Sequence, residues 1–325
     1  MHVVVIGGGS GLFQAVKAVR PIAQRMTVIV PTCGDEGADA LIRRLGPYPG
    51  VAGVVDVLLY VSRDAAMQRL MQQQFMPLGT PYDRISFGIL QLIASAQSLG
   101  SLPDAIDGLK QQLRCDIDVL MASETAHDVV VQTSDNRTYR GTNQITQLLS
   151  APVQSVLLDP AVVANPAALK ALRVADLVLI APGSLYRTVL PALLPNGIGE
   201  TLRSLAGNVI CCGALTTEHG QTDAFRAVDY IARIARTLGR GAIDVALLNS
   251  YQYPATAVGQ LKQHNMAPLR YDAKDAHVLA ALDIRPMVRD MLMNVEGTNS
   301  VMLAKLTTHD ETELRMGVVS SQRLN

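Results

Sequence analysis

The sequence predicts an α/β fold: a doubly wound, mostly parallel, Rossmann-like sheet with helices on both faces and a small β-rich insertion. Short apolar runs typical of buried parallel strands alternate with amphipathic helical patterns. Two of these runs stop abruptly at glycine-rich turns, as strands do at the carboxyl edge of such a sheet. No repeat or low-complexity linker divides the 325 residues, so we expect one large domain over 1–325, with a weaker signal over 250–325.

The order of the elements follows from the spacing of apolar residues. Strands are expected at 3–6, 27–30, 116–122, 155–158, 177–180, 208–212 and 243–248. Helices are expected at 12–24, 53–61, 64–76, 85–99, 104–114 and 224–237, and Asn165 followed by Pro166 marks a further helix start. Closely spaced strand signals predict the β-rich insertion at roughly 115–145. The tail from 285 suggests two helical stretches and a strand at 301–306.

The composition excludes several classes of protein. Formal net charge is zero and no run of Lys or Arg occurs, so a nucleic-acid partner has no electrostatic support. Four Phe and no Trp leave few rings for stacking on single strands. No apolar stretch approaches the length of a membrane span, and no basic segment precedes the short apolar run at the start, so we expect a cytoplasmic protein. A hydrophobic fraction of 49% also suggests a homodimer.

The four cysteines have no metal-ligand spacing. They are Cys33, Cys115, Cys211 and Cys212. Cys211 and Cys212 are adjacent within an expected strand, so their side chains should alternate between its faces. We interpret all four as small, mostly buried hydrophobic residues.

The two glycine turns are the main candidates for ligand binding. The first turn is Gly7-Gly8-Gly9-Ser10-Gly11, and the second begins at Gly183-Ser184. Glycine lets the backbone approach a ligand, and free N–H groups at the start of the next helix favour a phosphate. A tight turn without a ligand is the alternative for each. Leu12 replaces the third glycine of the dinucleotide motif, and no Lys follows as in an ATP-type P-loop.

The second turn carries a specific family resemblance. The stretch Ala181-Pro182-Gly183-Ser184-Leu185-Tyr186 resembles the signature shared by YvcK-type gluconeogenesis factors and CofD-type 2-phospho-L-lactate transferases. The first turn, the segment 215–225 and Asn249 after Ile243-Asp244 also fit, in order and spacing, over roughly residues 1–250. The resemblance favours the YvcK-type branch and implies a Rossmann-like fold.

The resemblance also implies ligands. The YvcK branch implies a UDP-sugar such as UDP-N-acetylglucosamine and a role in central carbon metabolism, cell shape and envelope synthesis. The CofD branch implies a divalent metal, with Mg²⁺ as the cofactor considered, and transfer of a phosphorylated three-carbon acid. The expected ligand-binding residues are Gly7, Gly8, Gly9, Ser10, Gly11, Gly183, Ser184, Leu185, Tyr186, Thr217 and Asn249. Ser184 would meet a phosphate or cap a helix, and Tyr186 would contact a base or fill the core.

Several polar residues of the family pattern are replaced in this chain. Thr32 and Cys33 occupy the positions of two Asp residues, and Ala214 and Tyr230 replace an Asn and a His. Asp35, Glu36 and Asp223 remain as candidate metal ligands. Asp39 could supply a further carboxylate beside Asp35 and Glu36, and for these three a solvated loop with a helix cap is the alternative. Two hypotheses follow: a protein that binds a UDP-sugar or related phosphorylated metabolite, or a Mg²⁺-dependent transferase. No catalytic nucleophile or base can be named.

Overall fold

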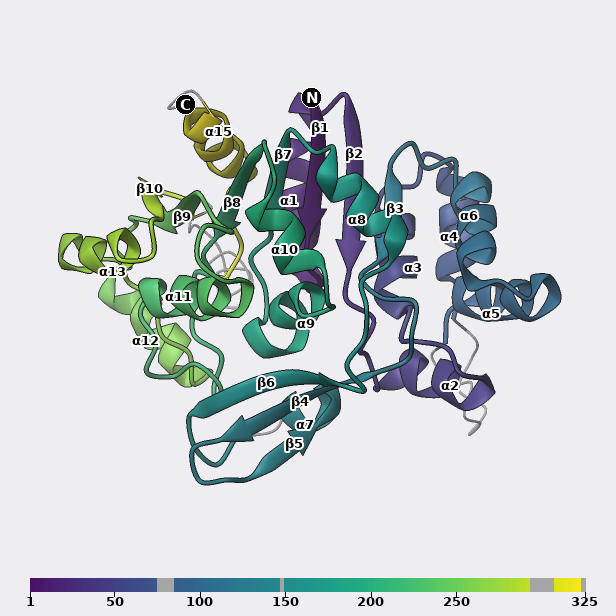
Figure 1. The fold of residues 1–325 in the computed structure, drawn as a ribbon, viewed down its shortest axis with the longest axis horizontal. Coiled ribbons are helices and arrows are strands. Elements are labelled where there is room, and N and C mark those ends of the chain that lie inside the picture. The colour runs from purple at the N-terminus through teal and green to yellow at the C-terminus, as the bar shows by residue number, and fades with distance from the viewer. Residues whose placement is uncertain (75–84, 147–148, 293–306, 323–325) are drawn as a thin grey trace.

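A seven-stranded parallel sheet runs through the middle of the molecule, in the order β10-β9-β8-β7-β1-β2-β3 (Figure 1). The computed structural model describes residues 1–74, 85–146, 149–292 and 307–322. The strands are β1 (His2–Ile6), β2 (Arg25–Val30), β3 (Asp118–Met121), β7 (Leu177–Ile180), β8 (Asn208–Cys212), β9 (Val245–Asn249) and β10 (Arg285–Arg289). The strand order reverses between β1 and β7, which makes this the predicted doubly wound sheet.

Helices cover both faces of the sheet, because alternate residues of each strand point to opposite sides. Val3 and Val5 of β1 belong to one buried cluster, and Val4 and Ile6 belong to the other. The first cluster packs against α1 (Gly9–Val19), α2 (Gly37–Leu45), α3 (Ala52–Tyr60), α4 (Ala65–Gln72), α5 (Phe87–Leu99), α6 (Leu102–Gln112) and α15 (Glu311–Gln322). The second packs against α8 (Pro166–Arg173), α9 (Leu190–Leu193), α10 (Ile198–Arg203), α11 (Ala227–Leu238) and α13 (Ala276–Ala280). A smaller cluster includes residues of α12 (Ala255–Gln263).

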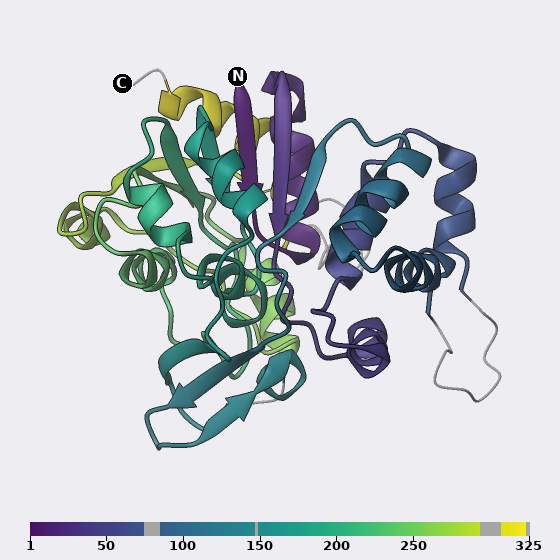
Figure 2. The same ribbon diagram turned by 45° about the vertical axis from the view of Figure 1, so that its right-hand side comes forward.

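A small antiparallel sheet lies beyond the carboxyl ends of the large sheet, in the order β5-β4-β6 (Figure 1 and Figure 2). Its strands are β4 (Asp128–Thr133), β5 (Thr138–Arg140) and β6 (Val153–Asp159), and it carries the short helix α7 (Gly141–Thr146). The insertion therefore covers 128–159 and not the expected 115–145. The expected strand 116–122 is β3, which pairs in parallel with β2 and so belongs to the large sheet. The expected strand 155–158 is β6, which pairs antiparallel with β4.

The tail differs from the sequence prediction in one respect. Residues 285–289 form the edge strand β10, which pairs with β9, where a helical stretch was expected. A proline at position 286 suits an edge strand, because an edge residue has no second neighbour to receive an N–H bond. Helix α15 follows and packs on α1 and β10. The expected strand at 301–306 lies outside the described residues.

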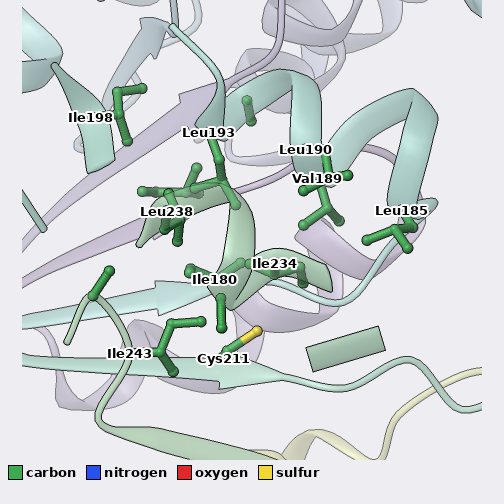
Figure 3. Close-up of a cluster of buried hydrophobic side chains, with 14 of the residues drawn as sticks. Ile180, Leu185, Val189, Leu190, Leu193, Ile198, Cys211, Ile234, Leu238 and Ile243 are labelled. Carbon is green, nitrogen blue, oxygen red and sulfur yellow. The ribbon is translucent and has the colours of Figure 1, made fainter. Parts of the chain in front are cut away.

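The segment after β7 is anchored in the core. Leu185–Val189 forms a turn of π-helix that continues into α9, and Figure 3 shows Leu185, Val189, Leu190 and Leu193 in the cluster that also contains Ile180 and Cys211. These side chains are almost completely buried. The second glycine turn is therefore held between a buried strand and a buried helical segment, which restricts its position.

Candidate functional site

The two glycine turns lie side by side at the point where the strand order reverses. One follows β1 and the other follows β7, and these two strands are paired in parallel, with Ile6 opposite Ile180. In doubly wound sheets, ligands bind outside the carboxyl ends of the strands at this point. Two cavities adjoin the turns, one on the side of β2 and one on the side of β8.

Three glycines of the first turn pack closely against the segment that follows β7. A Cβ at Gly11 would overlap the carbonyl oxygen of Pro182, and a Cβ at Gly7 would come within 3.0 Å of the Ala181 Cβ. A Cβ at Gly8 would lie 3.1 Å from the Thr188 Cβ. Close packing therefore accounts for these three glycines without a ligand. This agrees with the alternative considered for the first turn, a tight turn that binds no ligand.

Gly9 is different. Its φ is +69°, a left-handed conformation that favours glycine, and a Cβ there would meet nothing within 4 Å. Gly9 also begins α1, whose N-cap Gly8 supplies no side-chain cap and whose first turn contains no acidic residue. The first N–H groups of a helix lack intrahelical partners and carry partial positive charge. The open face at Gly9 thus has the chemistry of an anion site.

The larger of the two cavities, which we call cavity 1, has a volume of about 320 Å³. It lies between the first turn and β2, and the short helix α7 contributes Thr142 to its wall. Its other lining residues are Gly8, Gly9, Leu12, Phe13, Val30, Pro31, Cys33, Gly34, Glu36, Asp39, Gly53, Asp56, Val57, Arg187 and Thr188. This volume accommodates a phosphorylated group but not a whole nucleotide sugar.

Among the described residues that line cavity 1, Arg187 is the one that carries a positive charge. Its Nε donates to the Ser184 hydroxyl at 3.2 Å, and one terminal nitrogen donates to the Thr146 hydroxyl at 3.1 Å. The other terminal nitrogen lies 3.7 Å from a carboxylate oxygen of Glu218, a loose ion pair. Because its nearest partners are neutral hydroxyls and one distant carboxylate, the guanidinium keeps the capacity to bind a phosphate.

Carboxylates also line cavity 1, namely Glu36, Asp39 and Asp56. Asp39 accepts a hydrogen bond from the backbone N–H of Ala52 at 2.8 Å, at the start of α3. Loss of hydration on burial raises the pKa of Asp39 to about 6 and also raises the pKa of Asp56. Near neutral pH these carboxyls would repel a bare phosphate, or share a cation with it.

Cavity 3, the smaller of the two at about 150 Å³, lies on the β8 side and is lined by Ser10, Gly11, Gly183 and Ser184. The Ser184 hydroxyl donates to Glu218 at 2.7 Å. Through its two hydrogen bonds, Ser184 links Glu218, which lines cavity 3, to Arg187, which lines cavity 1. Ser184 also stands at the N-cap position of the following π-helical turn, but its side chain makes no capping bond.

Comparison with known proteins identifies the family of this chain. A family model described as 2-phospho-L-lactate transferase CofD matches residues 3–292. The chain belongs to the CofD family. A gluconeogenesis factor from Listeria innocua is 28% identical over 91% of this chain and 90% of its own length. A gluconeogenesis factor from Bacillus subtilis is 26% identical, over 88% of this chain and 90% of its length.

A further relative, from Deinococcus radiodurans, is 29% identical over 89% of this chain, which spans 61% of that relative's length. The crystal structure of a member of the UPF0052 family from Bacillus halodurans has the same fold, with a TM-score of 0.87, 24% identity and 98% of each chain covered. The predicted family and the predicted Rossmann-like fold are thus confirmed.

Four other residues expected from the CofD-family resemblance support the fold and line neither cavity. The side chains of Leu185 and Tyr186 are almost wholly buried, so Tyr186 fills the core. Thr217 pairs with Ala267 through both its backbone and its hydroxyl. Asn249 accepts backbone N–H bonds from Tyr251 and Met291, which fixes the turn after β9.

The three candidate metal ligands have separate hydrogen-bond partners. Asp35 accepts from the Thr142 hydroxyl at 2.5 Å and from a backbone N–H of α7, which ties the small sheet to the first loop. Glu36 is 3.4 Å from the Thr146 hydroxyl. Asp223 pairs with His219 and Gly220 in its own loop. In the part of the chain that the structure describes, no three His, Cys, Asp or Glu side chains are grouped to hold a metal ion.

The family positions that changed residue type now have structural roles. Thr32 is fully buried and donates its hydroxyl to the Ser123 carbonyl at 2.8 Å. Burial raises the pKa of the Cys33 thiol to about 12, so it stays neutral and acts as a small apolar residue, as expected. Tyr230 donates its phenol hydroxyl to the Gly183 carbonyl at 2.9 Å, which steadies the second turn.

Sequence reasoning named Glu36 and Asp39, which line cavity 1, but missed the other two charged residues there, Arg187 and Asp56. Arg187 directly follows the quoted signature, but its importance depends on the partners that the fold gives it. Asp56 is the single charged residue of α3, whose other residues are mostly apolar and buried, and sequence reasoning took the segment only as a helix. No helix among the described residues has the length and apolar character needed to cross a bilayer.

Proposed function

We propose that this protein binds a phosphorylated metabolite, with a UDP-sugar as the first candidate, and that the phosphate lies in cavity 1 against Gly9 and Arg187. The observation that carries the proposal is the meeting of an open left-handed glycine, an uncapped helix start and a guanidinium in one cavity. The names of the similar gluconeogenesis factors support a regulatory role in central carbon metabolism, and we extend the proposal to cell-envelope and cell-shape control.

Binding through these groups needs no catalytic side chain. Backbone N–H groups and a guanidinium recognise phosphate through geometry and charge. Their position at the reversal of strand order agrees with the general location of ligands in this fold. A pyrophosphate-bearing ligand would use cavity 1 for its charge and extend beyond it, since about 320 Å³ is too small for a whole nucleotide sugar.

A second candidate is a Mg²⁺-dependent transferase of a phosphorylated small molecule, as the CofD-family description suggests. The observation in its favour is the presence of Glu36, Asp39 and Asp56 around the same cavity. Mg²⁺ is commonly held by one or two carboxylates together with phosphate oxygens of the ligand. In this case the phosphate oxygens of the ligand would supply the remaining Mg²⁺ ligands. The carboxylates would then favour binding of the ligand through the shared Mg²⁺.

Calorimetric titration with UDP-N-acetylglucosamine, in Mg²⁺ and again in EDTA, separates the two candidates. Binding that persists in EDTA, and that is lost in Arg187→Leu, supports the metabolite-binding proposal. Binding that disappears in EDTA favours the metal-dependent transferase. If neither buffer gives heat, UDP-N-acetylglucosamine is not the ligand, and a thermal-shift panel of UDP, ATP, NAD and phosphoenolpyruvate follows. A panel without any stabilised sample would refute both candidates.

The regulatory part of the proposal requires a test in cells. A strain lacking this protein is complemented with wild type or with Arg187→Leu, and growth is compared on glycolytic and gluconeogenic carbon sources. We expect wild type to support growth on both and Arg187→Leu to fail on the gluconeogenic source while the protein accumulates normally. Equal growth of the two complemented strains would contradict a role for ligand occupancy.

A further inference from the structure

Another cavity, distinct from cavity 3, adjoins cavity 1 on the side away from the second turn. It has a volume of about 530 Å³ and shares two lining residues with cavity 1, Phe13 and Asp56. Its remaining lining residues are Ala38, Ala52, Leu59, Tyr60, Gln68, Gln72, Gln74, Ser86 and Ile89. We call it cavity 2. Phe13 and Asp56 therefore lie at the boundary between the two cavities.

Three helices each contribute two residues to the walls of cavities 1 and 2. Each pair is spaced four residues apart, so both members lie on one face of their helix. The pairs are Gly9 and Phe13 on α1, Asp56 and Tyr60 on α3, and Gln68 and Gln72 on α4. Helix α1 therefore carries the phosphate turn at its start and, one turn later, an aromatic ring that lines both cavities.

The aromatic rings of cavity 2 form a stacked pair. The ring centroids of Phe13 and Tyr60 are 4.7 Å apart, with 30° between the ring planes. Tyr60 is 40% exposed, so much of its surface remains available to a ligand. Burial raises the pKa of Tyr60, and the phenol is neutral at physiological pH. An accessible aromatic ring of this kind favours stacking with another planar ring.

Amide side chains line the same space. Gln68 donates its amide N–H to the Leu59 carbonyl at 2.8 Å, which orients the side chain and presents its amide oxygen as an acceptor. Gln72 lies one helical turn further along α4. Amides provide both donors and acceptors, and the edge of a nucleobase needs both. An apolar metabolite would offer these amides no hydrogen-bonding partner.

We propose that cavity 2 binds the heterocyclic base of a nucleotide whose phosphates occupy cavity 1. The base stacks on Tyr60 and the Gln68 and Gln72 amides bind its edge, while the phosphates contact Gly9 and Arg187. This inference rests on the proposed function, because it takes the phosphate position from it. It adds the recognition surface that distinguishes a nucleotide from other phosphorylated metabolites.

The test compares a ligand with a base and one without. The affinities of UDP and of inorganic pyrophosphate are measured by calorimetry for wild type, Tyr60→Leu, Gln72→Ala and Arg187→Leu. Leucine preserves apolar contact with Phe13 while removing the ring, and an unchanged melting midpoint checks the fold. Gln73→Ala is the matched control, because Gln73 is the exposed neighbour of Gln72 and does not line cavity 2.

We expect Tyr60→Leu to weaken UDP about tenfold or more and to leave pyrophosphate unchanged, since base stacking is lost. Gln72→Ala should weaken UDP alone, Gln73→Ala neither ligand, and Arg187→Leu both. If Tyr60→Leu and Gln72→Ala bind UDP as well as wild type, the base lies elsewhere and the inference is wrong, although the phosphate site stands. If wild type binds neither ligand, the proposed function fails and the inference falls with it.

Discussion

Gly11 lies against Pro182 so closely that a Cβ at position 11 would overlap the proline carbonyl oxygen. This contact joins the turn after β1 to the turn after β7, across 171 residues of sequence. It accounts for a glycine that the sequence alone assigns to ligand binding. The glycine-rich turn therefore serves two purposes: Gly7, Gly8 and Gly11 let the turns pack, and Gly9 leaves its face open.

Gly11→Ala is expected to destabilise the fold. The added methyl group must displace backbone in a buried contact, and overpacking of this kind typically costs about 1–3 kcal/mol. Urea denaturation measures the loss. Gly108→Ala is the control, because Gly108 lies within α6 with nothing near its Cβ position and alanine favours helix. Equal stability of Gly11→Ala and wild type would show that the second turn can move away.

Gly9→Val is expected to abolish binding of the phosphorylated ligand. The valine side chain would project into the open space where we place the phosphate. Its left-handed φ also costs stability, so Gly100→Val serves as a matched control: Gly100 has φ +67° and is equally open, but it ends α5. Both variants should lose similar stability in thermal melts, and Gly9→Val alone should lose ligand. Retained binding in Gly9→Val would place the ligand elsewhere.

Arg187 and Glu218 should affect anion binding in opposite directions. Arg187→Leu removes a charged hydrogen-bond donor, worth about 1.5–3 kcal/mol, and should weaken pyrophosphate roughly 10- to 100-fold. Glu218→Gln removes the carboxylate 3.7 Å from the guanidinium and should tighten binding several-fold. Arg173→Leu, at an exposed position on α8, is the control. Calorimetry measures all three, and weaker binding in Glu218→Gln would contradict competition for Arg187.

Asp39 should make stability depend on pH. Its pKa is raised by burial from 3.8 to about 6, so the folded state favours the protonated carboxyl. Stability from this group is therefore full below pH 3.8 and declines as pH rises toward 6 and above. The decline is at most roughly 3 kcal/mol for a shift of this size.

Asp39→Asn keeps the acceptor for the Ala52 N–H and removes the titration. In urea denaturation at pH 4 and pH 7, the variant should lose less stability over this interval than wild type. Asp64→Asn provides a contrast of opposite sign, because backbone N–H bonds at the start of α4 lower the pKa of Asp64. Parallel pH profiles for Asp39→Asn and wild type would contradict a raised Asp39 pKa.

Strands with uninterrupted apolar runs were predicted accurately. The expected ranges 177–180 and 208–212 coincide with β7 and β8, because central parallel strands are buried on both faces and leave a continuous apolar signal. The helix start at Asn165 was also correct, since its side chain accepts from the backbone N–H of Ala167 at 2.8 Å. In these places, local chemistry and tertiary environment agree.

Strand partners could not be predicted in the same way. The expected strands 116–122 and 155–158 have similar signals, but the first pairs with β2 in the large sheet and the second pairs with β4 in the small sheet. The residues of a segment indicate that it forms a strand. Which strand it pairs with depends on the path of the chain between the strands. The insertion was therefore expected too early in the sequence.

The class of fold, the two glycine turns and the family could be predicted from the amino-acid sequence, because contiguous segments carry their signals. Which glycine is open, which carboxylates face cavity 1 and which partners Arg187 has became known from the folded structure. These properties depend on contacts between segments distant in sequence, such as Gly11 with Pro182 and Arg187 with Thr146. Local patterns do not encode such distances, because they arise only when the sheet brings the loops to one edge.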